Sequence, residues 1–157
     1  MLRAVGLAIA WSPFLAMAQT PLAIPPALQG PMVNLTLDEG QKEFIMGMMA
    51  PTIGYNGNYL GPTVFLNAGD MAQMMVQNDL ADTTTTHWHG LHVAPMDDGS
   101  PHQPILPGQM WMPDFQIMDK AGTYWYHPHL HGKTMEQVIL GAAGLIIVND
   151  AEESALD

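Results

Sequence analysis

Short segments in which apolar and polar residues alternate run along most of the chain. The first begins at Val33, where Val33, Leu35 and Leu37 are separated by polar residues. Side chains of a β-strand point to opposite faces in turn, so this alternation predicts a strand with one buried face. Residues 41–47 are predicted to form its partner strand. Further strands are predicted at residues 63–67, 71–77, 87–93, 111–117, 123–127 and 145–148.

Turn-forming residues separate these segments. Asn56-Gly57 is typical of a tight turn, and residues 94–108 are rich enough in proline and glycine to predict a long irregular loop. Pro113 indicates an edge strand. Thr134 to Gln137 fits a capping box and predicts one short helix. Many short strands with frequent turns predict an all-β protein, a Greek-key β-sandwich or barrel.

The chain divides into four predicted parts. Residues 1–18 resemble a secretory signal, with Arg3 before an apolar run and a small-x-small cleavage site at residues 16–18. An N-terminal anchor is the alternative for this segment. Residues 19–31 are a proline-rich extended lead-in, residues 32–150 form the folded domain, and residues 151–157 are an acidic tail or the start of a linker between domains. A signal predicts a periplasmic or secreted protein with no membrane span after its removal.

Composition narrows the possible functions. The net charge of −11 disfavours nucleic acid, because phosphate binding needs clustered Lys and Arg. The chain has no cysteine, which excludes disulfides, cysteine nucleophiles and a blue-copper centre within it. Fourteen methionines are present. Met46, Met48 and Met49 are expected to pack in the interior rather than to capture copper.

Five of the seven histidines fall in two short aromatic segments. His87 and His89 flank Trp88, and His127 and His129 flank a proline. On a strand, each pair shares one face, with Cα atoms roughly 6.5–7 Å apart. Trp88 would lie on the opposite face, packed in the core, and Trp125, two residues before His127, on the same face as that histidine. Either both rings of a pair bind one metal, or each binds a separate metal of a cluster. Packed core imidazoles are the structural alternative.

Four neutral imidazoles suit copper or zinc rather than magnesium or calcium. A zinc hydrolase would need three imidazoles and a water, so it stays open on chemistry alone. His131 continues the alternation at the turn into the helix, and His102 lies in the proline-rich loop. Either could touch metal, whereas His92 is expected to lie behind the ligands or on the surface.

The two histidine segments resemble the N-terminal cupredoxin domain of multicopper oxidases. This family includes laccases, bilirubin-oxidase-like enzymes and bacterial copper-efflux oxidases. The resembling segments are residues 86–92 and 122–129, supported by residues 58–63, 98–101 and 141–148. The resemblance extends from about residue 33 to residue 150 and implies a cupredoxin-like fold.

The resemblance also implies a role for individual residues. His87 corresponds to a ligand of the type 2 copper, and His89, His127 and His129 to ligands of the type 3 copper pair. Asp98 corresponds to the carboxylate that manages protons while dioxygen is reduced. Asp97 could be confused with it, but Asp98 directly precedes the Gly-Ser-Pro segment.

The family's partner histidine motifs and its cysteine-containing copper site are absent from this sequence. The resemblance therefore implies half of a trinuclear copper site, in an oxidoreductase that uses dioxygen and an unidentified electron donor. The missing cupredoxin domains would lie in the same chain or in another one. The alternative is a periplasmic copper carrier or buffer without catalysis.

Overall fold

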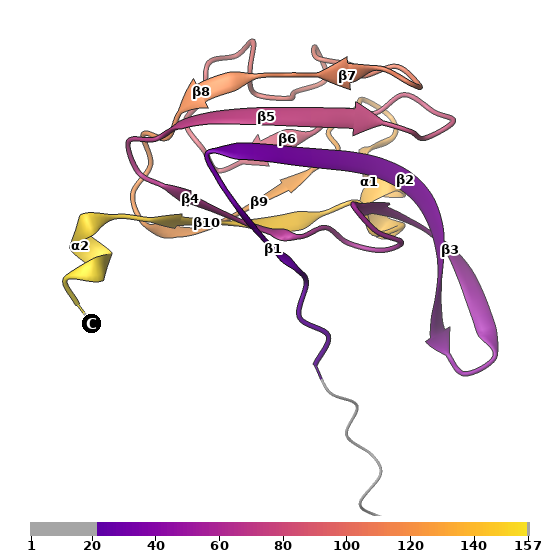
Figure 1. The fold of residues 1–157 in the computed structure, drawn as a ribbon. Helices are drawn as coiled ribbons and strands as arrows, with labels where there is room; N and C mark the ends of the chain where they lie inside the picture. The colour runs from indigo at the N-terminus through magenta and orange to yellow at the C-terminus, as the bar shows by residue number, and fades with distance from the viewer. Residues whose placement is uncertain (1–21, 157) are drawn as a thin grey trace, which may run out of the picture.

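The computed structural model describes residues 22–156 and folds them into two five-stranded β-sheets that pack face to face (Figure 1). The all-β, two-sheet architecture predicted from the alternating pattern is confirmed. The predicted signal at residues 1–18, and residues 19–21 of the predicted lead-in, lie outside the described residues.

The first sheet carries both histidine pairs at one edge. Its strand order is β1-β4-β10-β9-β6. Strands β1 and β4, and β4 and β10, are parallel, whereas β10, β9 and β6 pair antiparallel. The strand predicted at residues 145–148 is confirmed, and it lies in β10, the central strand of this sheet. The strands are β1 (Ala27–Gln29), β4 (Thr63–Asn67), β6 (His87–His89), β9 (Gly122–His127) and β10 (Gly144–Asn149).

The second sheet covers the inner face of the first. Its order is β3-β2-β5-β7, and β8 also pairs with β5. Strand β2 runs parallel to β5 and antiparallel to β3, while β7 and β8 run antiparallel to β5. The strands are β2 (Met32–Ile45), β3 (Met48–Tyr55), β5 (Met71–Asn78), β7 (Met110–Trp111) and β8 (Asp114–Gln116).

The core lies between the two sheets. Val33, Leu35 and Leu37 of β2 point inward and are almost completely buried, which confirms the predicted buried face. Each such side chain stabilises the fold by about 1.5–3 kcal/mol relative to exposure. The largest side chains buried with them are Trp88, Tyr55, Tyr126, Leu66, Met74, Ile105, Ile117 and Ile146.

The prediction for residues 41–47 was wrong. These residues are not a partner strand but the second half of β2 and the turn after it, and the partner is β3. The polar residues around Gly40 suggested a strand end. Gly40 is instead a packing position, since a Cβ there would meet the backbone of Asn58.

The β2–β3 hairpin extends beyond the two sheets (Figure 1). Met46, Met48 and Met49 lie at its tip, and Met46 is 96 % exposed. The expectation that they pack in the interior is therefore wrong. A local sequence pattern could not reveal the exposure of these methionines, because their exposure depends on how far the hairpin projects from the rest of the fold.

Two predicted strands are shorter than their patterns suggested. The strand at residues 87–93 ends at His89, because Gly90 adopts a φ of 95° and Leu91 turns back to bond the Trp88 carbonyl. The strand at residues 111–117 divides into β7 and β8 around Pro113, which has no N–H to donate. Strands β7 and β8 both pair with β5 at the edge of the second sheet, so the predicted edge position is confirmed.

One short helix follows the second histidine segment, as predicted. Helix α1 spans Thr134–Ile139, but its N-cap is Lys133 and no side chain caps it, so the predicted capping box is wrong. The Thr134 hydroxyl bonds the Leu130 carbonyl instead. Residues 94–108 form the expected irregular loop, apart from an isolated bridge at Ile105.

Both ends of the described chain hold short elements. Strand β1 lies within the predicted extended lead-in, and a one-turn helix α2 (Ala151–Ser154) begins the segment predicted as a tail or linker. The Asp150 side chain caps α2 by accepting from the Glu153 N–H. Among the described residues, the helices are all too short to cross a lipid bilayer.

Gly144 gives a test of how tightly the core is packed. A Cβ at this position in β10 would overlap the ring of Tyr126, whose hydroxyl donates to the Pro62 carbonyl at 2.7 Å. We expect Gly144→Ala to lower the free energy of unfolding by about 1–3 kcal/mol, because the buried ring must move. Urea unfolding followed by tryptophan fluorescence measures this change.

Gly57→Ala is the matched control. A Cβ at Gly57 would enter open space, so its free energy of unfolding should stay within about 0.5 kcal/mol of the parent protein. Equal losses in the two variants would contradict the packing assigned to Tyr126.

Candidate metal centre

The antiparallel pairing of β6 with β9 brings the two histidine segments together. In its register His87 lies opposite His127, and His89 lies opposite Trp125. Because alternate side chains share a face, His87, His89 and His127 all lie on one side of the sheet. Trp88 and Tyr126, between them, point into the core, as predicted for Trp88.

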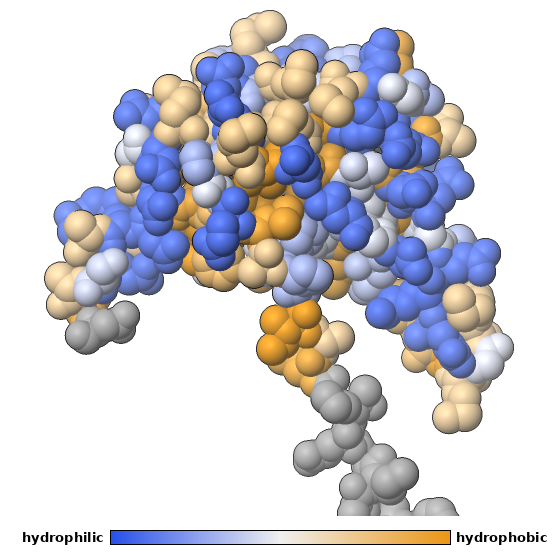
Figure 2. All heavy atoms as spheres, viewed as in Figure 1, coloured by the Kyte–Doolittle hydropathy of each residue, from blue (hydrophilic) through white to orange (hydrophobic). Residues whose placement is uncertain are grey.

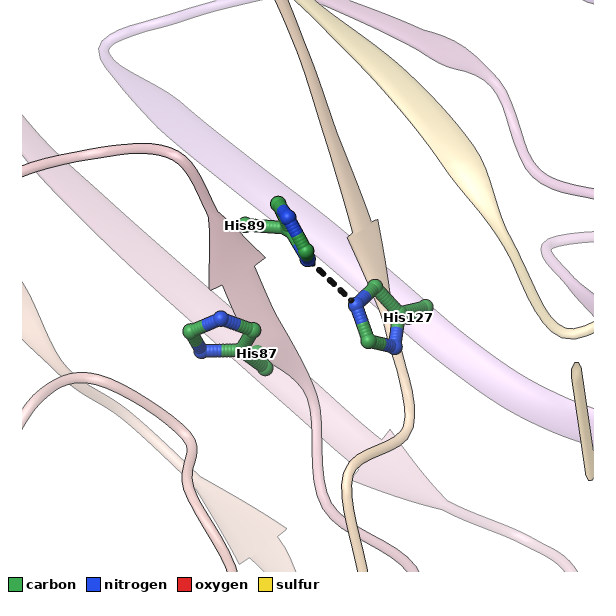
Figure 3. Close-up of side chains that lie close together, drawn as sticks. All are labelled: His87, His89 and His127. Carbon is green, nitrogen blue, oxygen red and sulfur yellow. Dashed lines mark hydrogen bonds between the residues drawn. The ribbon is translucent and has the colours of Figure 1, made fainter. Parts of the chain in front are cut away.

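The three imidazoles converge. One ring nitrogen from each of His87, His89 and His127 lies within 4.8 Å of the other two. Nδ1 of His89 and Nε2 of His127 face each other at 3.1 Å (Figure 3). Two nitrogens bound to one metal at about 2.0–2.1 Å would lie about 3.3 Å apart at the tetrahedral angle. The observed separation therefore suits a shared metal ion.

Backbone carbonyls fix how two of these rings are turned. The carbonyl of Asp98 lies 2.8 Å from Nδ1 of His87, and the carbonyl of Pro128 lies 2.8 Å from Nδ1 of His127. A carbonyl only accepts, so Nδ1 carries the proton in each ring. In the neutral form of each ring, Nε2 is then the unprotonated nitrogen that can bind a metal.

His127 is held in the neutral form that metal binding requires. Burial, followed by the nearby imidazoles of His87, His89 and His129, lowers the pKa of His127 to about 4, although the bond to the Pro128 carbonyl acts in the opposite direction. His127 is buried, His87 half-buried and His89 exposed. Exposure therefore increases from His127 to His87 to His89, and a ligand from another molecule or domain can reach the exposed side of the cluster.

Trp125 covers the site from one side, as its position two residues before His127 suggested. Its ring stacks on His127 with centroids 4.0 Å apart, and it lies 4.9 Å from the ring of His89. This contact restricts the rotation of both imidazole rings.

Three consecutive buried threonines support the site from behind, a feature that the sequence pattern did not reveal. The Thr84 hydroxyl bonds Gln137 on α1, Thr85 accepts the His129 backbone N–H at 2.7 Å, and Thr86 bonds the Tyr55 hydroxyl. Burial raises the pKa of Tyr55 well above its usual value, so its hydroxyl keeps its proton. Threonine is mostly exposed in folded proteins, so these residue types alone did not indicate burial.

His129 lies beside the converging group rather than within it. Its ring centroid is 5.2 Å from that of His87 and 5.9 Å from that of His127, and the residue is exposed. Pro128 takes the chain out of the sheet between the two histidines, so His129 follows the end of β9. All four predicted metal histidines therefore lie at one end of the sheet, with three in close contact.

The other three histidines have different surroundings. His92 is exposed and its ring pairs with the buried carboxylate of Asp119, which also accepts the His92 backbone N–H. His102 and His131 are exposed, and neither belongs to the converging group found among the described residues.

Asp98, the predicted proton-managing residue, lies next to His87. Its carboxylate Oδ1 is 3.3 Å from Nδ1 of His87, and it is partly exposed. The side chain of Asp97 makes no such contact. Its backbone carbonyl accepts from the Trp88 indole at 3.0 Å. The geometry thus distinguishes two neighbouring carboxylates that are hard to tell apart in the sequence.

The donor set fits copper. Three imidazole nitrogens converge, with no thiolate among them. Imidazole suits copper, zinc and other transition metals, whereas calcium and magnesium prefer oxygen ligands. When bound, copper supplies one-electron redox chemistry that the side chains lack.

Comparison with known proteins identifies relatives over most of the chain. A family model described as "Multicopper oxidase" matches residues 36–153. The multicopper oxidase mco of Staphylococcus aureus is 41 % identical over 121 residues, which are 77 % of this chain and 27 % of that protein. A cell division protein FtsP, from Salmonella typhimurium, is 36 % identical over 135 residues, covering 84 % of this chain and 29 % of the relative.

Comparison with solved structures also identifies multicopper oxidases as relatives. The laccase-like multi-copper oxidase CueO from Ochrobactrum sp. superposes with a TM-score of 0.82 at 40 % identity. The match covers 86 % of this chain and 31 % of that protein. This chain therefore spans between about a quarter and a third of the length of the relatives it matches.

Thr85 offers a test of the buried support behind the histidines. Thr85→Val keeps the shape of the side chain but removes the acceptor of the His129 N–H. Leaving a buried donor without a partner should lower the free energy of unfolding by about 1–3 kcal/mol. Urea unfolding measures the loss, and amide hydrogen exchange should become faster at His129.

Thr83→Val is the control, since the Thr83 hydroxyl makes no hydrogen bond within the described part of the chain. Unchanged exchange at His129 in Thr85→Val would show that Thr85 does not hold this residue.

Proposed function

Because the chain belongs to the multicopper oxidase family, we propose that it is the N-terminal cupredoxin domain of such an oxidase and supplies half of a trinuclear copper site. In the complete protein this site would reduce dioxygen to water. The observation that carries the proposal is the convergence of His87, His89 and His127 at one end of the sheet. Family membership alone would not suffice, since one relative is named as a cell division protein.

Each histidine has a proposed role. His87 would bind the type 2 copper through Nε2, because its Nδ1 is occupied by the Asp98 carbonyl. His89, His127 and His129 would bind the type 3 pair. The facing nitrogens of His89 and His127 support a shared ion for these two residues, and the exposed position of His129 suits a second ion nearer the surface.

Asp98 would handle protons next to the copper site. Reduction of one dioxygen to two waters consumes four protons, and these must reach a site lined by neutral imidazoles. The carboxylate of Asp98 is partly exposed and lies beside His87, so it can take protons from solvent and release them at the site.

The rest of the oxidase chemistry must come from elsewhere. This sequence has no cysteine, so an electron-entry copper held by thiolate cannot form within it. The remaining histidines and that copper would belong to further cupredoxin domains, in the same protein or in another chain. An unidentified donor would supply four electrons, one at a time, for each dioxygen.

The proposal includes how the chain is organised and where it acts. Residues 1–18 would direct export as a signal, and the mature protein would be periplasmic or secreted. Residues 19–31 would lead into the domain at residues 32–150. Residues 151–157 would form a tail or begin the linker to the next domain, starting with α2.

A copper carrier or buffer is the second candidate. It is favoured by the partial exposure of the site, since His89 and His129 are open to solvent and could pass an ion to a partner. In that case the four histidines would bind one or two coppers without reducing dioxygen.

Copper titration of the full chain tests the ligand assignment. His89→Ala and His127→Ala should each raise the dissociation constant for Cu(II) by roughly tenfold or more, because each removes a converging nitrogen. Electron paramagnetic resonance should show nitrogen coupling in the parent chain that weakens in both variants. His102→Ala is the control and should bind as the parent does. Normal binding by both site variants would refute oxidase and carrier alike.

The role of Asp98 is testable in the longer protein that carries the remaining domains. Asp98→Asn should lower kcat for dioxygen reduction on the order of 10²-fold while copper content stays the same, because proton delivery is lost but no ligand is. Asp97→Asn is the matched control and should keep its activity. If the copper-loaded parent protein consumes no dioxygen with any donor, the carrier function is the better description.

A further inference from the structure

The sheet built from β2, β5, β7 and β8 carries different apolar residues on its two faces. Its inner face is ordinary core, with mostly aliphatic and aromatic side chains and a single buried methionine. The inward residues are Val33, Leu35, Leu37, Ala72, Met74, Val76, Phe115 and Ile117.

On the outer face, over residues 32–38, 71–77 and 110–116, every large apolar side chain is methionine. Figure 2 shows moderately hydrophobic side chains interspersed among hydrophilic ones over β5, β7 and β8, at the top of the view. Valine, isoleucine and aromatic residues are better strand formers than methionine, so strand propensity does not explain the choice. The outward methionines are Met32, Met71, Met75, Met110 and Met112.

Met75 on β5 has one of these methionines in the neighbouring chain segment at each side of it. Val76 pairs with Trp111 and Gln73 with Asp114, so Met75 lies opposite Met112. On the other side of β5, Met32 pairs with Gln73, which places Met32 diagonally next to Met75. Directly opposed Cβ atoms lie about 4.5–5.5 Å apart and diagonal ones about 7–8 Å, within reach of long flexible side chains.

The three side chains also share a surface depression. It has a volume of about 230 Å³, and Met32, Met75 and Met112 line it together with Gln73, the buried Met74, Pro113 and Asp114. Met32 is 61 % exposed and Met112 is 66 % exposed, so both thioether groups are accessible from solvent.

The charge around the depression favours a cation. Asp114 borders it and Asp38 lies further along β2, whereas the described lysines, Lys42, Lys120 and Lys133, lie outside this part of the sheet. The net charge of the whole chain is −11, which raises the local concentration of cations. Thioethers are soft ligands that select Cu(I) over hard ions such as magnesium or calcium.

We propose that Met32, Met75 and Met112 together bind Cu(I) on the outer face of this sheet. The site is separate from the histidine cluster, which lies on the other sheet, and it does not depend on the proposed oxidase function. A protein partner would be a different occupant, but protein interfaces concentrate aromatic residues and arginine, and this face carries neither.

Titration with Ag(I) tests the proposal. Ag(I) shares the charge and softness of Cu(I) and is stable in air. The full chain is labelled with ¹³C at the methionine methyl groups and followed by NMR in chloride-free buffer. The methyl signals of Met32, Met75 and Met112 should shift together along one saturable binding curve. The signal of Met135, which is exposed on helix α1, should not move, and Zn(II) should leave all methionine signals unchanged.

Substitutions identify the ligands. Met75→Leu and Met112→Leu conserve volume and hydrophobicity, so the fold should tolerate them. Each should raise the dissociation constant for Ag(I) by roughly tenfold or more, because one of three sulfur ligands is lost. Met135→Leu is the matched control. Met135 is also exposed but lies on helix α1, and its replacement should leave the affinity unchanged.

Two results would overturn the proposal. One is a parallel shift of all exposed methionine signals without saturation, which would mean non-specific contact between Ag(I) and thioethers. The other is an earlier shift of Met46, Met48 and Met49, which would place the preferred site at the tip of the β2–β3 hairpin. Because only methionine methyl groups are observed, copper binding by the histidines, or its failure, does not affect the outcome.

Discussion

The candidate metal centre depends on the register between β6 and β9. This register sets His87 opposite His127 and, one position along, Trp88 opposite Tyr126. The two aromatic side chains are completely buried, so a shift by one residue would expose them and turn the histidines into the core. Hydrophobic burial on one face of the sheet thus fixes the positions of imidazoles on the other. This coupling explains how three imidazoles come to face one another.

Contacts from distant parts of the chain then orient the individual rings. The loop carrying Asp98 places a carbonyl on Nδ1 of His87, and Pro128 does the same for His127. Thr85 holds the backbone of His129 after the chain has left the sheet. The supporting groups are mostly backbone or hydroxyl, which remain uncharged across the physiological range. These supporting groups therefore add no charge to the site, and the carboxylate of Asp98 lies beside His87.

The two sheets share one hydrophobic core but present side chains with different donor atoms to solvent. One has imidazoles at its β6–β9 end, and the other has thioethers on its outer face, so nitrogen and sulfur donors are kept apart. The same two-residue period produces both arrangements, since each strand buries one set of side chains and presents the other. The chain covers only about a quarter to a third of its relatives, and an open cluster of imidazoles at the end of a sheet is consistent with a partner domain completing it.

The amino-acid sequence by itself determined the all-β class, the family resemblance, the shared face of each histidine pair and the burial of Trp88. These follow from local periodicity, which a strand imposes on neighbouring residues whatever the rest of the chain does. Only the tertiary structure decided that β3 pairs with β2, that the threonines before His87 are buried, and that Met46 is exposed. It also distinguished Asp98 from Asp97 and fixed which nitrogen of His127 is free. Those features arise from contacts between segments far apart in sequence, and a pattern read along one segment contains no information about what packs against it.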